Sequence, residues 1–323
     1  MWNLMPKTTG RTNQTFPVGF ILLGISEWPQ LERTLFWVVI FLFTMSILGN
    51  SSIILLSCVD PRLHTPMYFF LSNLSFLDLC LTSASVPQML VHLWGSDKSI
   101  THTGCVIQLC VFLCVGATEG VLLVQMAIDR YVAVCQPLRY TALMHRPLCW
   151  KLVFLAWLSG LIVSLVESST IFQLPFCPHH LLNGFLCEVP VLLRLACGDT
   201  SVNEWQMTIT TVIFTMVPVG LILASYGCIA QAVRNMKSEE GRKKVTATCS
   251  SHLLVVFMFY GTVAMVYTDP KSNFASKNGK FFTFFYTVVT PLLNPLVYTL
   301  RNKEVKDAWL RLMRKWVSLW KSK

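Results

Sequence analysis

Seven long apolar segments, separated by short polar ones, set the pattern of the sequence. They lie near Leu35 to Cys58, Pro66 to Leu93, Gly104 to Val134, Leu148 to Ile171, Val202 to Val233, Val245 to Tyr267 and Phe281 to Tyr298. A transmembrane helix needs about 20 mostly apolar residues, and each segment has about that length. The pattern predicts an all-α membrane protein in which residues 35–300 form a bundle of seven transmembrane helices.

The two ends of the chain differ from this bundle. Residues 1–34 hold no apolar core of a cleaved signal peptide, so we expect an extracellular segment and targeting by the first helix. Residues 301–323 mix Trp and Leu with Lys and Arg, which is typical of an amphipathic helix lying on anionic lipid. We therefore expect a cytoplasmic tail that contains a short amphipathic eighth helix.

Composition and charge fit a membrane protein better than a nucleic-acid-binding one. The chain is 54% hydrophobic and 13% charged with a net charge of +10, and so has too little polar surface for a soluble globule. If residues 1–34 lie outside and the helices alternate, eight of the 26 Lys and Arg residues lie outside: Lys7, Arg11, Arg33, Lys98, Arg194, Lys271, Lys277 and Lys280. The excess on the other side predicts a cytoplasmic C-terminus. Asn13, in the sequon Asn13-Gln14-Thr15, is then expected to be glycosylated.

Polar residues inside the apolar segments are costly unless they find partners. Asn50 needs one from another helix, and Asp78 is the obvious candidate. Two carboxylates that approach one another tend to share a proton or a cation. We therefore predict that Asn50, Asp78, Glu119 and Asn294 form a polar core that holds a proton or Na⁺. The alternative is that Glu119 is a protonated acid bonded to a backbone carbonyl.

An acid and a base, Asp129 and Arg130, lie where the third apolar segment ends, within the string MAIDRYVAVCQPLRY. An ionisable pair at this depth is a functional candidate. Adjacent helical residues project in different directions, so the two meet only if the Arg stem turns back towards the carboxylate. Such a contact can be broken, which suits a switch. The alternative is two charges at an ordinary helix end.

Four cysteines fall on the predicted outer side. Cys105 begins the third segment, and Cys177, Cys187 and Cys197 lie in the loop after the fourth. An even number on the oxidising side predicts two disulfides, and four cysteines allow three pairings. The other eight are expected to be free. His179 and His180 are adjacent in the same loop, where histidines are usually solvated, so we expect no metal site.

Three motifs together resemble one family. The string that contains Asp129 and Arg130 is similar to MAYDRYVAICxPLxY of olfactory receptors, with Ile128 and Val134 in place of Tyr and Ile. LHTPMYFFLSNLSFLDLC in the second segment and PLLNPLVY in the seventh agree with the same family. The sixth-helix motif KAFSTCxSHL is matched only in part, by KKVTATCSSHL. From about Phe20 to Asp307, the chain is identified as a member of the olfactory receptors, within the rhodopsin-like (class A) G-protein-coupled receptors.

The resemblance implies a function and a set of residues. It implies a receptor that binds a small hydrophobic volatile among its helices and activates a heterotrimeric G protein of the stimulatory, olfactory type to raise cAMP. It also selects the disulfides Cys105–Cys187 and Cys177–Cys197. The expected G-protein switch consists of Asp129, Arg130, Tyr131, Tyr226, Asn294, Pro295 and Tyr298.

The expected ligand cavity begins on the third helix. Five residues of that helix fall on one face: Leu109, Phe112, Leu113, Gly116 and Ala117. Such a stripe is typical of helix packing, but the small Gly116 and Ala117 leave room for an apolar ligand, and the resemblance favours this interpretation. The other expected cavity residues are Thr210, Thr211, Phe214, Tyr260, Val263, Val266, Tyr267 and Thr287. An uncharged ligand is favoured, because no acid lies on the upper cavity face of this helix. Glu167, where the family usually has Gln, receives no role.

Other function classes fit the sequence less well. Asp78 and Glu119 imitate an intramembrane aspartyl pair, but no protease signature surrounds them. A transporter is expected to show repeated half-bundles or broken helices in matching positions, and neither is visible. We therefore predict no enzyme, no cofactor beyond Na⁺, and a plasma membrane protein whose partners are lipid, odorant and G protein rather than nucleic acid. The remaining alternative is a rhodopsin-like receptor for another small uncharged ligand, with a role outside the nose.

Overall fold

The computed structural model describes residues 19–24, 29–95, 97–177, 180–267, 277–301 and 303–321. Asn13 and His179 lie outside these ranges, and the side chains of Val266 and Tyr267 are also outside the description. Among the described residues, seven helices are long and apolar enough to cross a membrane: Leu31–Val59, Pro66–Trp94, His102–Cys135, Arg146–Ile171, Ser201–Arg234, Glu239–Met265 and Gly279–Thr299. The predicted class, a multi-pass bundle of seven helices, is confirmed.

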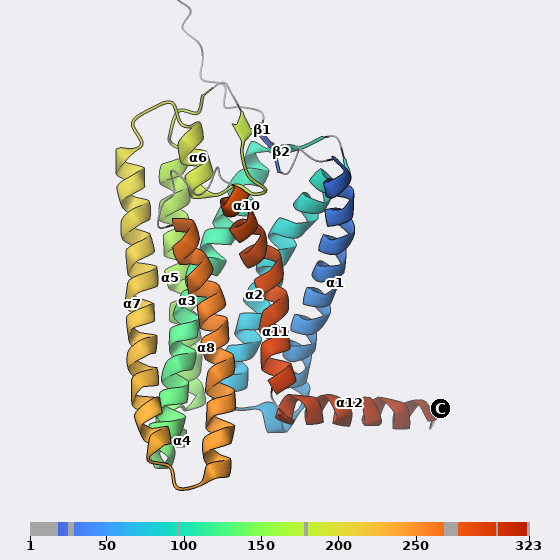
Figure 1. Cartoon of the computed structure of the whole chain (residues 1–323), viewed down its shortest axis with the longest axis vertical. Helices are drawn as coiled ribbons and strands as arrows, with labels where there is room; N and C mark the ends of the chain where they lie inside the picture. The colour runs from blue at the N-terminus through green and yellow to red at the C-terminus, as the bar shows by residue number, and fades with distance from the viewer. Residues whose placement is uncertain are drawn as a thin grey trace, which may run out of the picture.

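The seven crossings stand side by side, and a further helix leaves the bundle sideways (Figure 1). The first six crossings are α1 (Pro29–Val59), α2 (Pro66–Trp94), α3 (His102–Cys135), α5 (Arg146–Ile171), α7 (Ser201–Arg234) and α8 (Glu239–Tyr267). The seventh consists of α10 (Lys277–Phe284), the π-helical η3 (Phe285–Val289) and α11 (Thr290–Arg301). The helix that projects sideways is α12 (Lys303–Lys321), the expected eighth helix.

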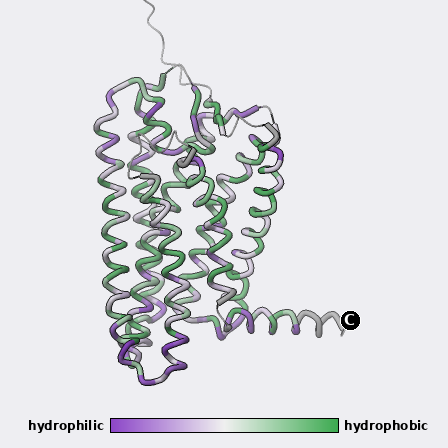
Figure 2. Tube along the Cα trace, viewed as in Figure 1, coloured by the Kyte–Doolittle hydropathy of each residue, from purple (hydrophilic) through white to green (hydrophobic). Residues whose placement is uncertain are grey.

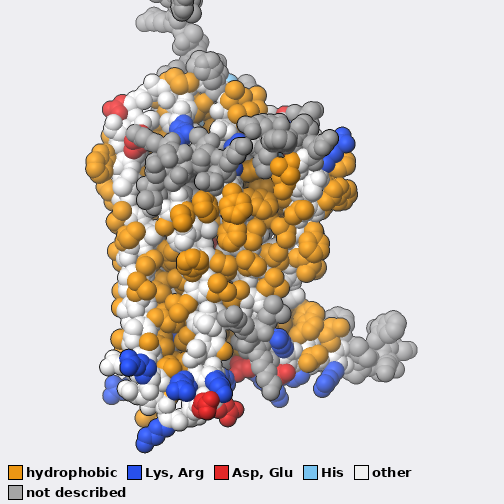
Figure 3. Space-filling model, in the orientation of Figure 1, with side chains coloured by type: hydrophobic (Ala, Val, Ile, Leu, Met, Phe, Trp, Pro, Cys, Tyr) orange, Lys and Arg blue, Asp and Glu red, His pale blue; other side chains and the backbone are white. Residues whose placement is uncertain are grey.

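The outer faces of the bundle are apolar. Large side chains such as Phe154, Leu223 and Phe257 are exposed there, and the helices are hydrophobic along most of their length (Figure 2). Figure 3 shows apolar side chains across the middle of one face, and basic side chains at the end of the bundle where α7 connects to α8. This apolar surface suits contact with lipid rather than water. The helices hydrogen-bond their own backbone groups, so only apolar side chains need to face the hydrocarbon.

Helix α3 forms the centre of the bundle and packs against α2, α5, α7 and α8. Helix α5 approaches it closely at Gly160. A Cβ atom at this position would overlap the Thr118 hydroxyl and the Cys114 carbonyl oxygen of α3. Small residues let membrane helices approach closely, so Gly160 brings the α5 backbone against α3.

A small sheet covers one end of the bundle, which we call the sheet end. Its strands are β1 (Gly19–Leu22), β2 (Ser99–Thr101) and β3 (Leu181–Leu182), in the order β2-β1-β3. β1 is antiparallel to β2 and parallel to β3. Phe20 and Leu22 of β1 are buried in a cluster with Leu109 and the Cys105–Cys187 disulfide. The sequence did not predict these strands, and it did not predict the short helix α6 (Val189–Leu195) beside them.

At the opposite end, the tail end, α12 is tied to the turn that follows α1. Arg311 donates from Nε and from a terminal nitrogen to Asp60, at 3.0 and 2.6 Å. Burial raises the pKa of Asp60. The hydrogen bonds from Arg311 and the Arg62 backbone, together with the positive charges of both residues, lower the pKa by a larger amount, so it lies below its usual value. Val305 and Ala308 are buried on the inner face of α12. The helix is therefore fixed to the bundle as well as suited to a membrane surface.

Candidate functional site: a cavity within the bundle and an ion pair at the tail end

A cavity of about 140 Å³ lies among the helices. It includes eight of the predicted residues: Phe112, Leu113, Gly116, Ala117, Thr210, Thr211, Phe214 and Val263. An apolar protein cavity of about 150 Å³ accommodates benzene. The cavity therefore has room for a small molecule of about six to eight non-hydrogen atoms.

Three predicted residues do not line this cavity. Leu109 is fully buried in the cluster beneath the sheet, because that part of α3 lies under the loop rather than beside the cavity. Tyr260 donates its hydroxyl to the Gly120 carbonyl oxygen at 2.9 Å, and so joins α8 to α3. Thr287 is fully buried in η3. Val266 and Tyr267 have no described side chains, so their predicted roles stay predictions.

The cavity also has walls that the sequence did not indicate. These residues come from seven elements: Leu81, Val163, Glu167, Val189, Met207, Thr215, Phe259, Tyr286, Thr290 and Pro291. Val163 and Glu167 are on α5, which Gly160 holds close to α3. The only sequence signal for Glu167 was an unusual acid near the outer end of an apolar segment.

The polar core forms, but with different hydrogen bonds from those expected. Asn294 Nδ2 donates to both carboxylate oxygens of Asp78 at 3.1 Å. Asn50 was expected to pair with Asp78; it donates instead to the Pro291 carbonyl oxygen at 2.9 Å. Asp78 and Glu119 both line the cavity.

Three oxygen atoms in the polar core are buried without a hydrogen-bond partner in the described part of the chain: Asn50 Oδ1, Glu119 Oε1 and Asn294 Oδ1. Carboxylate and amide oxygens are the ligands that hard cations prefer. The residues present therefore fit a small cation or a shared proton. The described residues contain no cluster of three or more His, Cys, Asp or Glu side chains suited to a bound metal.

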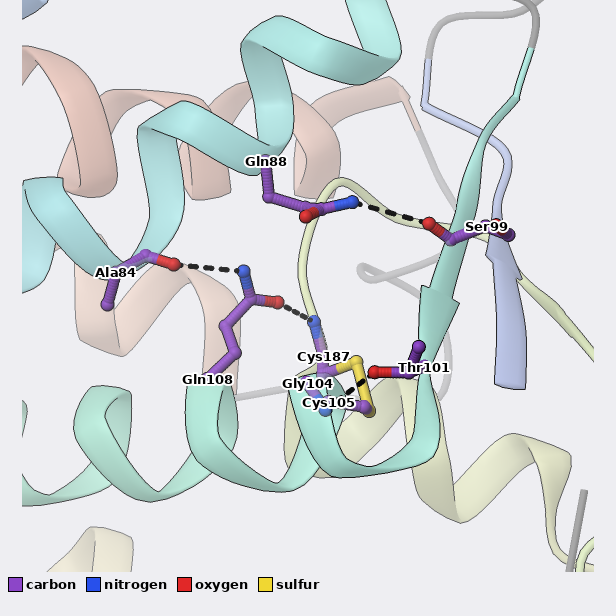
Figure 4. The surroundings of a disulfide bond; sticks show 8 residues. All are labelled: Ala84, Gln88, Ser99, Thr101, Gly104, Cys105, Gln108 and Cys187. Carbon is purple, nitrogen blue, oxygen red and sulfur yellow. Dashed lines mark hydrogen bonds between the residues drawn. A yellow bond between two sulfur atoms is a disulfide. The ribbon is translucent and has the colours of Figure 1, made fainter. Parts of the chain in front are cut away.

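Two disulfides fix the long loop at the sheet end, with the pairing that the resemblance implied. Cys105 is bonded to Cys187 and Cys177 to Cys197. Gln108 supports the first bond: its side chain accepts from the Cys187 backbone N–H at 2.9 Å and donates to the Ala84 carbonyl oxygen at 3.3 Å (Figure 4). The loop is thereby held against α2 and α3.

The residue after Cys187 is a buried acid. Glu188 is 1% exposed and precedes α6. Burial raises its pKa to about 7, while hydrogen bonds from Tyr286 and Thr283 lower it by less. Its neighbour Val189 lines the cavity. The Cys105–Cys187 disulfide therefore positions part of the cavity wall as well as the loop.

The ion pair at the tail end has the predicted geometry. The Arg130 stem turns back, and its Nε and a terminal nitrogen donate to Asp129 Oδ2 at 3.1 and 2.6 Å. Tyr140 donates to the other carboxylate oxygen at 2.8 Å. Asp129 is 1% exposed. The short elements η2 (Pro137–Arg139) and α4 (Tyr140–Leu143) bring Tyr140 to the carboxylate, a partner that the sequence did not predict.

Of the other predicted switch residues, Tyr298 lies beside this pair and Tyr226 reaches it through His252, while Asn294 is bonded to Asp78 in the polar core. His252 and Tyr298 share a small cavity with Asp129 and Arg130, and the Tyr226 hydroxyl hydrogen-bonds His252 Nδ1 at 2.8 Å. Tyr131 is half-buried against the main apolar cluster. Pro295 packs against α1 at Gly49, where a Cβ atom would lie 3.1 Å from the proline ring. The structure therefore places all of these residues in the half of the bundle nearer the tail.

Seven helices long and apolar enough to span a membrane, an internal cavity and a buried acid–base pair at one end define a seven-helix membrane protein with a candidate ligand site. The sequence profile described as "Olfactory receptor" matches residues 39–315. The chain is 57% identical over 303 residues to "Olfactory receptor 2H1" of Homo sapiens, covering 94% of this chain and 96% of that protein. It is 55% identical over 296 residues to "Olfactory receptor 2C1" of Mus musculus, covering 92% and 95%.

The chain belongs to the olfactory receptor family, as the three motifs indicated. Members of this family are receptors and not enzymes, so Asp78 and Glu119 are not a catalytic pair. Family membership implies odorant ligands and coupling to G proteins in general terms.

Proposed function

We propose that this protein is an odorant receptor of the plasma membrane, which binds a small hydrophobic volatile in the cavity and activates a stimulatory, olfactory-type G protein to raise cAMP. One observation carries the proposal. Helix α3 contributes Gly116 and Ala117 to the cavity and also carries Asp129 and Arg130 at the tail end. A ligand in the cavity therefore contacts the same helix that holds the ion pair.

In this proposal the sheet end faces the outside and the tail end faces the cytoplasm. Two disulfides at the sheet end support this orientation, because disulfides persist in oxidising surroundings. Exposed basic residues in the turn after α7 and at the start of α8, such as Lys237 and Arg242, support it from the other end. Asn13 would then be glycosylated.

Activation is a shift between two arrangements of the helices. A ligand favours the active one only if it binds that arrangement more tightly than the inactive one. The structure holds Arg130 on Asp129, and Tyr140 donates to the same carboxylate. In the active arrangement α8 moves outward, Arg130 leaves Asp129, and Tyr226 and Tyr298 move in beside it. The polar core of Asn50, Asp78, Glu119 and Asn294 would hold a proton or Na⁺ in the inactive arrangement.

Replacement of Arg130 by Ala tests this mechanism. We expect the variant to reach the cell surface and to lose the cAMP response to odorants, because the G protein meets no guanidinium when the helices open. The measurement is a cAMP reporter assay in cells with a broad odorant panel, with responses normalised to surface staining. Arg139→Ala is the matched control, since Arg139 is exposed in η2. An unchanged response in Arg130→Ala would contradict the proposal.

A further inference from the structure

We propose that Glu167 and Thr210 form a polar subsite in the cavity, which binds the hydrogen-bond-donating head group, hydroxyl or ammonium, of an otherwise apolar odorant. The inference rests on the proposed function and adds the chemical class of the ligand. The two residues come from different helices, Glu167 from α5 and Thr210 from α7, and both line the cavity.

The contacts of Glu167 leave acceptor capacity unused. Thr210 donates its hydroxyl to Glu167 Oε1 at 2.8 Å, and Gln206 is a second neutral side chain that hydrogen-bonds the carboxyl group. A carboxylate has about four acceptor positions. Among the described residues, no Lys or Arg forms an ion pair with Glu167. A donor on a ligand therefore has a free place on this carboxyl group.

The apolar surroundings of Glu167 make its carboxyl group unfavourable for the stability of the fold. Glu167 is 3% exposed, and Val163, Met207 and Phe214 are among the side chains that line the same cavity. A buried carboxyl group without a cationic partner is unfavourable, and an apolar side chain of similar volume would serve packing better. A polar group kept in an apolar ligand cavity typically fixes the orientation of the ligand.

Two other carboxyl groups line the cavity and are the rivals for this role. Asp78 lies in the polar core, where Asn294 donates to both of its carboxylate oxygens. Glu119 belongs to the polar core with it and lies further along α3 towards the tail end than Gly116 and Ala117. Glu167 is four residues from the end of α5 at the sheet end. A ligand that enters from the sheet end would meet Glu167 before the polar core.

The test compares ligands that differ only in their head group. Cells that express the full chain receive cyclohexanol, cyclohexylamine, cyclohexanone and methylcyclohexane, with equivalent benzyl and hexyl sets, in the cAMP assay. We expect the wild type to prefer the alcohol or the amine over the ketone and the hydrocarbon by at least about tenfold in half-maximal concentration, since a hydrogen bond to a charged group corresponds to about ten- to hundredfold in affinity.

Variants of Glu167 test whether this residue causes the preference for alcohols and amines. Glu167→Leu should remove that preference. Glu167→Gln, which keeps an acceptor oxygen but no charge, should weaken the response to amines about tenfold and leave alcohols within a few-fold. The control is Ser169→Ala, an exposed position on the same helix. If Glu167→Leu does not reach the cell surface, the isosteric variant Thr210→Val tests the inference instead. It removes the hydrogen bond that orients the Glu167 carboxylate, so the preference for alcohols and amines should fall several-fold.

Three outcomes overturn the inference: a wild-type response without any preference for donors, a preference that survives in Glu167→Leu or Thr210→Val, or a preference that Glu119→Gln abolishes and Glu167→Gln does not. A wild type that reaches the surface and answers none of the compounds would count against the proposed function, and against this inference with it.

Discussion

Gly160→Ala is expected to remove most of the receptor from the cell surface. The added methyl group would overlap the Thr118 hydroxyl and the Cys114 carbonyl oxygen of α3. Because backbone atoms cannot turn aside, α5 would have to move away from the central helix. Overpacking of this kind costs about 1–3 kcal/mol and sometimes more. The measurements are surface staining of tagged receptor and the thermal unfolding temperature of the purified protein.

Gly227→Ala is the matched control for this change. Gly227 is also inside a helix, is exposed, and a Cβ atom there would meet nothing within 4 Å. Ala is better than Gly in a helix by about 0.5–1 kcal/mol, so this variant should be as stable as the wild type or more so. Equal surface levels for Gly160→Ala and Gly227→Ala would show that α5 and α3 are not packed as described.

Loss of the Cys105–Cys187 disulfide is the second change with a large expected effect. The bond joins residues 82 positions apart, and removal of a native disulfide typically costs about 2–5 kcal/mol. In the double variant Cys105→Ser/Cys187→Ser the loop would leave α3, and Val189 with it, so both stability and the odorant response should fall. Thermal unfolding and the cAMP assay measure the two effects.

Cys228→Ser is the control, because Cys228 is an exposed free cysteine on α7. It should behave as the wild type. A double variant that unfolds at the same temperature as Cys228→Ser would contradict the assigned role of the disulfide.

The sequence predicted the seven helices well because a membrane imposes a simple rule: a span must be long and apolar. Prediction from the sequence was less accurate for the parts of the chain outside the apolar segments, where this rule does not apply. The sixth helix was predicted from Val245, but α8 begins at Glu239, since the part outside the membrane need not be apolar. Strand β1 pairs with residues far along the chain, and so short a segment gives no signal of its own.

The cavity was predicted only in part for a related reason. A helix in a membrane is apolar on its lipid face as well as its inner face, so hydropathy does not fix its rotation about its axis. Small residues did indicate Gly116 and Ala117. The closeness of α5 to α3, and with it the position of Glu167, depends on packing at Gly160, which no local pattern shows.

Some contacts of the polar residues could be predicted from the sequence and others could not. Asp129 and Arg130 are adjacent in sequence, so their contact could be predicted from the length of the Arg side chain. Tyr140 reaches the same carboxylate through two short turns, and the partner of Asn50 proved to be a backbone carbonyl of another helix. Contacts of this kind depend on the tertiary structure.

The account depends most on the cavity being the place where odorants act, and Gly116→Trp tests that directly. Gly116 lines the cavity and a Cβ atom there would meet nothing within 4 Å, so a side chain at this position begins in open space and the indole ring should occupy the cavity. The control Gly220→Trp adds the same ring at an exposed, unobstructed position of α7. In the cAMP assay, at equal surface levels, the account predicts that Gly116→Trp loses its response to odorants by at least about tenfold while Gly220→Trp keeps it. A Gly116→Trp receptor that answers the same odorants at the same concentrations as the wild type would contradict it.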